Sequence, residues 1–221
     1  FRKDDDVRWQ YGVPPRGNAN FAWVQHFIHH LAPHGMAGFV LANGALSATG
    51  PQGEIKAAVI EADLVDCIVM LPPKLFYTTQ APVSLWFFSK NKQSPREKER
   101  ARKREALFID ARKCFVKSGP THNTLTEEHL ELIVRTYHAW KAPGQVGYTE
   151  IIGFCRSVRT ELIAERDYSL VPARHVGINV DPPDRESTLQ ALNSSLQSIT
   201  TSLHQMDELA VRVKESILKL G

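Results

Sequence analysis

Several features that would assign a protein to a class are missing from this sequence. No apolar run in its 221 residues is long enough to span a bilayer, so a membrane protein is not expected. The opening residues, FRKDDDVRWQ, are polar and do not form a secretory signal. The three cysteines lie far apart, and two fall within apolar runs. This pattern predicts buried, reduced thiols in a cytoplasmic protein.

Complete catalytic motifs are missing too. There is no Gly-rich phosphate loop, no nucleophile elbow and no cysteine pair with metal-binding spacing. His26 and His30 have the spacing of a zinc-binding helix, but no Glu follows the first and no further ligand lies close in sequence. We interpret them as polar residues of a helix surface, and Asp4 to Asp6 as a solvated charge run. The residues alone predict no metal site and no complete catalytic apparatus.

What is present is an alternation of helix and strand in the first half of the chain. With 43% hydrophobic and 23% charged residues, the composition is that of a globular protein with a core. Helical periodicity over residues 18–31 is followed by an apolar strand at 36–43, a helix at about 53–62 and a strand at 64–72. This order predicts an open α/β sheet with crossover helices. We expect the uniformly apolar strand at 36–43 to be covered on both faces.

The stretch LFYTTQAP, Leu75 to Pro82, joins the strand at 64–72 to the apolar run VSLWFF. The connection is too short for a helical crossover, so it predicts an antiparallel hairpin as the last strand of an otherwise parallel sheet. Strand connections are normally polar and rich in turn residues. Phe76 and Tyr77 are therefore unexpected at this tip.

A basic run follows, KNKQSPREKERARKR at residues 90–104, with eight Lys or Arg against two Glu. A solvated loop between edge strands is the simpler interpretation. An arm that contacts phosphates is the alternative, because clustered cations beside a sheet end suit electrostatic DNA binding. Residues 105–110, EALFID, are predicted to form one more edge strand.

The remainder of the sequence is predicted to be mostly helical. An amphipathic helix at 126–141 and a short helix near 159–165 lie within a connector at 116–184 that follows the first domain at 1–115. Residues 185–221 are predicted to form a coiled-coil-like helix that contacts another subunit, with packing inside the same chain as the alternative. Its apolar seam has alternating spacings of three and four: Leu189, Leu192, Leu196, Ile199, Leu203, Met206, Ala210, Val213, Ile217 and Leu220.

Four segments, taken in order, carry a resemblance to a known family. They are GNANFAWVQHFIHHLAPHGMAGFVLANG, IKAAVIEADLVDCIVMLPPKLFYTTQAPVSLWFFSKNK, LFIDARK and YTEIIGFCRSVRTELIAERDYSLVPARHVG. Together they resemble the modification (methyltransferase) subunit of type I restriction-modification systems. The resemblance implies an adenine-specific DNA methyltransferase that uses S-adenosylmethionine. It also implies four partners: duplex DNA, the specificity subunit, the restriction subunit and a second modification subunit.

The resemblance implies the fold as well. The chain is expected to supply the C-terminal half of a class I S-adenosylmethionine-dependent methyltransferase sheet, ending in an antiparallel hairpin, and then a helical region with a long heptad helix. Two motifs of the family, the Gly-rich donor loop and the Asn-Pro-Pro-aromatic motif, are missing, and Val13 to Pro15 lacks the Asn. We therefore expect a C-terminal fragment that is inactive by itself.

Site residues follow from the same resemblance. Phe76 matches an aromatic residue that packs on an extruded adenine, and burial in the sheet edge is the alternative. Asn18 and Asn20 face the donor side of the cleft or act as helix caps. The competing function is a non-catalytic DNA-binding or subunit-assembly module. The expected DNA contacts are Lys74, Tyr77, Lys90, Lys92 and Arg96.

Overall fold

The computed structural model describes residues 3–77, 79–93 and 99–177, and eight residues between 193 and 206. The chain divides into two compact units, Phe1–Ile178 and Asn179–Gly221. Most of the predicted heptad positions lie outside the described residues. The described ones lie in helical segments with exposed side chains: Leu196, Ile199 and Met206.

The first unit alternates helices and strands along the chain. No helix among the described residues combines the length and the apolar character needed to cross a membrane. In chain order the elements are α1 (Asn20–His30), β1 (Met36–Ala42), η1 (Asn43–Ser47), α2 (Gly50–Glu61), β2 (Val65–Met70), β3 (Val83–Ser89), β4 (Glu105–Asp110), β5 (Val116–Lys117), β6 (Asn123–Thr124), α3 (Glu127–Lys141), η2 (Pro143–Gln145), β7 (Cys155–Arg159), α4 (Thr160–Ala164) and η3 (Pro172–Arg174).

The main sheet has five strands in the order β1-β3-β2-β4-β7. The predicted hairpin is confirmed, because β2 and β3 pair antiparallel. The expectation of an otherwise parallel sheet is met only in part. The strands β1, β2 and β4 run in one direction, and β3 lies between β1 and β2 and is antiparallel to both. The strand β7, however, is also antiparallel, to its neighbour β4.

Two further expectations about the strands are corrected. Residues 105–110 do not form an edge strand, because β7 pairs with the outer side of β4. The strand β1 is not covered on both faces: its residues alternate between half-buried and exposed, and β3 is its only strand neighbour among the described residues. The apolar sequence of β1 therefore occurs at a sheet edge.

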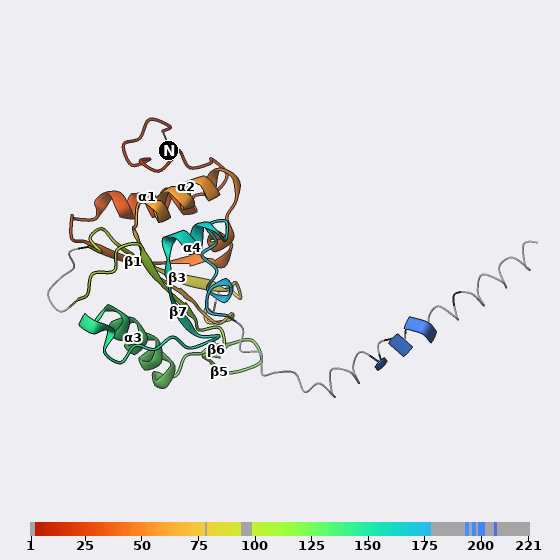
Figure 1. The fold of residues 1–221 in the computed structure, drawn as a ribbon. Coiled ribbons are helices and arrows are strands. Elements are labelled where there is room, and N and C mark those ends of the chain that lie inside the picture. Colours follow the sequence, from red (N-terminus) through yellow and green to blue (C-terminus); the bar gives the residue numbers. More distant parts are fainter. Residues whose placement is uncertain are drawn as a thin grey trace, which may run out of the picture. The chain divides into compact units, whose positions relative to one another are not determined.

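Helices cover both faces of the sheet and enclose two cores. As Figure 1 shows, α1, α2 and α4 lie on one face and α3 on the other. The alternation of side chains along each strand supplies both cores. Within β2, for example, Ile68 joins the core under α1 and α2, whereas Cys67 and Val69 join the core under α3.

The helix α3 begins as its sequence predicts. Thr126 precedes it in an extended conformation, and its hydroxyl accepts a hydrogen bond from the backbone N–H of His129 at 3.3 Å. Glu127 and Glu128 occupy the first turn, where negative charge stabilises the positive end of the helix dipole. Ile133 and Trp140 are buried against the sheet.

Candidate nucleic-acid interface

The loop that joins β2 to β3, residues 71–82, begins beside the carboxyl end of β4. The N–H of Ala111 donates to the carbonyl of Met70 at 2.9 Å, which ties the two strand ends together. Leu75 packs against the core under α3, and the two residues after it project outward. Phe76 is 44% exposed and Tyr77 is 93% exposed. The tip of the loop therefore presents two aromatic side chains to solvent.

A short ribbon formed by β5 and β6 lies against this loop. The imidazole of His122 stacks on the ring of Tyr77 with a centroid distance of 4.3 Å and an interplanar angle of 13°. The next residue, Asn123, is buried, and its side-chain amide donates to the carbonyl of Pro73 at 2.8 Å. The ribbon and the loop thus form one surface that carries the exposed aromatic residues.

The basic run is mostly engaged with the protein itself. Lys92 is 3% exposed, and its ammonium contacts Asp63 at 2.6 Å and the carbonyl of Val65 at 2.8 Å. Burial lowers the pKa of Lys92, and the Asp63 carboxylate opposes that shift. The burial of this charge against a carboxylate argues against the predicted contact of Lys92 with DNA.

Other cations of the run are also paired. Arg102 and Asp66 are both fully buried and joined at 2.6 Å, while Arg104 contacts Glu161 at the surface, also at 2.6 Å. Lys90 is exposed, and its ammonium donates to the carbonyl of Leu31 at 2.7 Å. Arg96, another predicted DNA contact, lies outside the described residues. The described part of the run therefore supports a fixed connection between β3 and β4.

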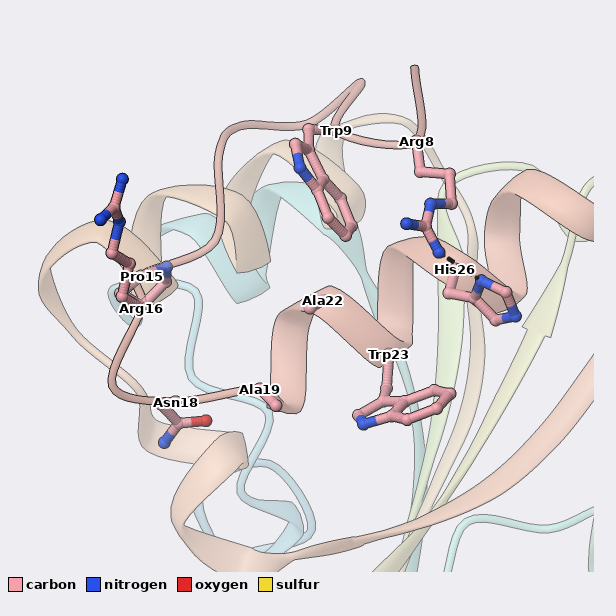
Figure 2. Close-up of a pocket in the computed structure, with 9 residues that line it drawn as sticks. All are labelled: Arg8, Trp9, Pro15, Arg16, Asn18, Ala19, Ala22, Trp23 and His26. Atoms are coloured by element: carbon pink, nitrogen blue, oxygen red, sulfur yellow. Dashed lines mark hydrogen bonds between the residues drawn. The ribbon is translucent and has the colours of Figure 1, made fainter. Parts of the chain in front are cut away.

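A groove of about 720 Å³ lies between α1 and the chain that precedes it (Figure 2). In Figure 2 the Trp9 ring extends from this preceding chain toward α1, and Trp23 extends from the helix itself. Arg8 lies within hydrogen-bonding distance of His26, with Nη1 and Nδ1 3.0 Å apart. The full lining is Arg8, Trp9, Pro15, Arg16, Asn18, Ala19, Ala22, Trp23 and His26.

Asn18 and Asn20 are placed differently with respect to this groove. The side-chain oxygen of Asn18 accepts a hydrogen bond from the backbone N–H of Asn20 at 2.9 Å, in the turn that leads into α1, whose N-cap is Ala19. Asn18 also lines the groove, whereas Asn20 does not. The helix α1 has no side-chain capping hydrogen bond at Ala19, and a role of Asn18 or Asn20 as a cap or toward a donor stays a prediction.

Asn43 was not singled out by the sequence and is unusual in the structure. It directly follows β1. Its backbone N–H donates to the carbonyl of Pro82 at the end of the β2–β3 loop, residues 71–82, which we call the aromatic loop. Both its side-chain oxygen and nitrogen are covered and lack a hydrogen-bond partner within the described residues. A covered amide with no partner is uncommon in native proteins, and it lies next to the loop that carries Phe76.

The comparisons with known proteins decide the family. The family model described as N-6 DNA Methylase matches residues 2–181. The chain belongs to the N-6 DNA methylase family. It is 38% identical over 218 residues to the type I restriction enzyme HindI methylase subunit of Haemophilus influenzae, covering 98% of this chain and 47% of that protein. It is 40% identical to the MjaIX methylase subunit of Methanocaldococcus jannaschii, covering 99% of this chain and 39% of that protein.

A solved structure supports the same relationship. The N-6 DNA methylase chain matches the type I restriction-modification methyltransferase subunit from Streptococcus thermophilus with a TM-score of 0.65 at 30% identity. That match covers 77% of this chain and 33% of the other. The chain spans less than half the length of these relatives. The predicted resemblance to type I modification subunits is therefore confirmed.

Within this N-6 DNA methylase chain, the predicted site residues do not form one cluster. Lys74, Phe76 and Tyr77 lie on the β2–β3 loop, whereas Asn18 lies in the groove on α1. No three His, Cys, Asp or Glu side chains in the described ranges are arranged to hold a metal ion. The sequence analysis did not single out His122 and Asn123, because their partners Tyr77 and Pro73 lie 45 and 50 residues earlier in the chain.

Proposed function

We propose that this chain is part of a DNA methyltransferase that transfers a methyl group from S-adenosylmethionine to the exocyclic amine of adenine in duplex DNA. The relatives are methylase subunits of type I restriction enzymes, and the chain aligns with them along nearly its whole length. The observation that carries the proposal is the pair of exposed aromatic residues on the β2–β3 loop of an N-6 DNA methylase chain.

Base extrusion explains why exposed aromatic residues are useful here. An enzyme that modifies a base in duplex DNA must take it out of the stack, at a cost of a few kcal/mol. A ring that stacks on the extruded base returns about 1–3 kcal/mol. Phe76 is exposed without being stacked on another described ring, so its face is available to adenine. Tyr77 is already stacked on His122 and is the weaker candidate.

The described residues do not fit a donor site. The sequence has no Gly-rich turn between a strand and a helix, and the carboxylate that ends β4, Asp110, is held by Arg112 at 2.7 Å. We therefore assign no step of methyl transfer to these residues. We attribute donor binding to the part of the relatives that lies outside the aligned stretch, and we expect the 221-residue chain alone to be inactive.

We also infer the wider context from the relatives. The order β1-β3-β2, with β3 antiparallel, supports the C-terminal half of a class I methyltransferase sheet. We propose that the heptad helix binds the specificity subunit, and that the restriction subunit and a second modification subunit belong to the assembly. The division into a methyltransferase part at 1–115, a connector at 116–184 and an assembly helix at 185–221 stays a prediction.

Substitution of Phe76 tests the proposed function. In the complete polypeptide that contains this sequence, Phe76→Ala should slow methyl transfer to DNA by about tenfold, because a stacking energy of 1–3 kcal/mol is lost. Tritium transfer from labelled S-adenosylmethionine measures the rate, and 2-aminopurine at the target position reports extrusion. Val134→Ala, at an exposed site of α3 away from the loop and the ribbon, is the control. Unchanged kinetics in a folded Phe76→Ala variant would refute the stacking role.

The alternative of a non-catalytic DNA-binding or assembly module has less support. Its main argument was the basic run, and four described cations of that run bond to the protein itself: Lys90, Lys92, Arg102 and Arg104.

A further inference from the structure

Asn123 bonds twice to the aromatic loop. Its side-chain amide donates to the carbonyl of Pro73 at 2.8 Å, and its backbone N–H donates to the carbonyl of Lys74 at 2.9 Å. Asn123 is only 8% exposed, although it lies on a ribbon whose other residues are largely exposed. A buried residue whose side-chain amide and backbone N–H bond to two successive carbonyls fixes the backbone of the loop at that point.

The point that Asn123 fixes lies immediately before the aromatic pair. Lys74 adopts a left-handed conformation with φ of +61°, within a bend of the chain at residues 73–74. Leu75 then enters the core under α3 and anchors the next residue. Phe76 and Tyr77 thus directly follow residues 73–75, a segment that is held by two hydrogen bonds and by the packed side chain of Leu75.

The ribbon that carries Asn123 is itself well defined. The strands pair with Lys117 opposite Asn123, and the N–H of Ser118 donates to the carbonyl of His122 at 3.0 Å, which closes the turn. His122 also stacks on Tyr77. One turn of the ribbon therefore contacts the loop on both sides of Phe76, at Pro73 and Lys74 before it and at Tyr77 after it.

We propose that Asn123 is a positioning residue that orders the aromatic loop for base stacking. The proposal rests on the proposed function, in which Phe76 meets the extruded adenine. A loop that is ordered before DNA binds loses less conformational entropy when the base arrives, so more of the stacking energy stabilises the extruded state. Asn123 acts through Phe76 and does not itself touch the base.

The ordering itself is tested on the 221-residue chain without DNA or donor. In Asn123→Ala the backbone bond to Lys74 remains and the amide bond to Pro73 is lost. The order parameter of the Phe76 backbone N–H, measured by ¹⁵N relaxation, should fall from about 0.8 to below about 0.6. Thr124→Ala, at the exposed neighbour on β6, should leave it unchanged. An unchanged value in Asn123→Ala would overturn the proposal.

A second variant, Asn123→Asp, separates loss of the hydrogen bond to Pro73 from loss of folding. It keeps the size and shape of the side chain but removes the N–H₂ donor and places a carboxylate against the Pro73 carbonyl. The same fall in the Phe76 order parameter is expected, with the far-UV circular dichroism of the parent chain retained. A rigid Phe76 in this variant would equally contradict the proposal.

A double-mutant cycle in the complete polypeptide links the order to the reaction. Asn123→Ala should lower the methylation rate constant about fivefold to tenfold, while the KM for S-adenosylmethionine stays unchanged. Combined with Phe76→Ala, it should add nothing further, because its effect passes through that ring. Additive losses would overturn the positioning role. If Phe76→Ala alone has no effect, the proposed function fails, and the relaxation data still decide whether Asn123 orders the loop.

Discussion

At the scale of single residues, Asn43 combines a structural cost with a place beside the aromatic loop. Its amide is covered and has no partner within the described residues, which costs about 1–3 kcal/mol for an unsatisfied buried polar group. Asn43→Leu should therefore raise the free energy of unfolding by about 1 kcal/mol or more, measured by urea titration. Asn43→Asp, which buries a carboxylate at the same place, should lower it.

The same variant connects stability with activity. Residues kept at a cost to stability are often kept for function. If Asn43→Leu stabilises the protein and also slows methylation in the complete polypeptide, the amide serves the site next to Pro82. A lower stability in Asn43→Leu would show instead that the amide has a partner when the protein is in solution.

His175 makes stability depend on pH. It is fully buried, its ring stacks on Phe108 at 4.1 Å, and its Nε2 lies 2.7 Å from the carbonyl of Ser169, so Nε2 carries the proton of the neutral ring. Burial lowers the pKa of His175 to about 4, with the nearby Arg166 and Arg156 also disfavouring the charged form. In the unfolded chain the pKa is about 6.5.

The direction of the pH effect follows from these pKa values. Well above pH 6.5, His175 is neutral in both the folded and the unfolded state, so its ionisation costs no stability. As the pH falls below 6.5, the unfolded state takes up the proton first, so stability is lost until about pH 4. Between pH 7 and pH 5 the loss from His175 should be about 2 kcal/mol. Urea titrations at both pH values measure it.

A non-titrating variant isolates this contribution. In His175→Gln the difference in the free energy of unfolding between pH 7 and pH 5 should be smaller by about 2 kcal/mol. His29→Gln, at an exposed position, should leave this difference unchanged. An equal pH dependence in the parent chain and His175→Gln would assign the effect to other groups.

At the scale of elements, the sequence predicted those that repeat a periodic pattern. The helices α1 and α3 were expected because their apolar positions recur at helical spacing, and α2 and α4 were expected as short helices. The strand β7, CRSVR, was missed, since it is short and polar and pairs with β4 only through the tertiary fold. The burial of Lys92 was likewise invisible, because its partner Asp63 lies 29 residues away.

The docking of α3 on the sheet depends on a buried polar cluster. The hydroxyl of Tyr137 donates to the Asp66 carboxylate at 2.7 Å, beside the fully buried Arg102. Burial and the neighbouring Asp66 charge raise the pKa of Tyr137. Tyr137→Phe removes only this hydroxyl and leaves an oxygen of Asp66 with one bond fewer in the core.

We expect Tyr137→Phe to lower the free energy of unfolding by about 1.5–3 kcal/mol, the usual range for a hydrogen bond to a charged group. Arg135→Ala, at an exposed position of the same helix, should change it by less than about 0.5 kcal/mol. Chemical denaturation measures both. Equal stabilities of Tyr137→Phe and the parent chain would show that the cluster does not hold α3 on the sheet.

At the scale of the whole molecule, we predict that the first compact unit determines stability and the second determines assembly. Among the described residues, both cores of the first unit draw their buried side chains from the stretch between Phe21 and Val176, and we predict that this unit folds by itself. The second unit carries the predicted heptad seam, which by proposal binds another subunit. Stability and assembly should therefore be separable by one cut in the chain.

A chain shortened to residues 1–178 tests this separation. Its melting temperature should match that of the whole chain within about 2 °C, because the described core residues all lie between Phe21 and Val176. In the complete polypeptide, removal of residues 179–221 should abolish co-purification with a specificity subunit, the partner proposed for the heptad helix. An unfolded 1–178 chain would mean that the second unit contributes to the core, and retained co-purification would place the subunit contact on the first unit.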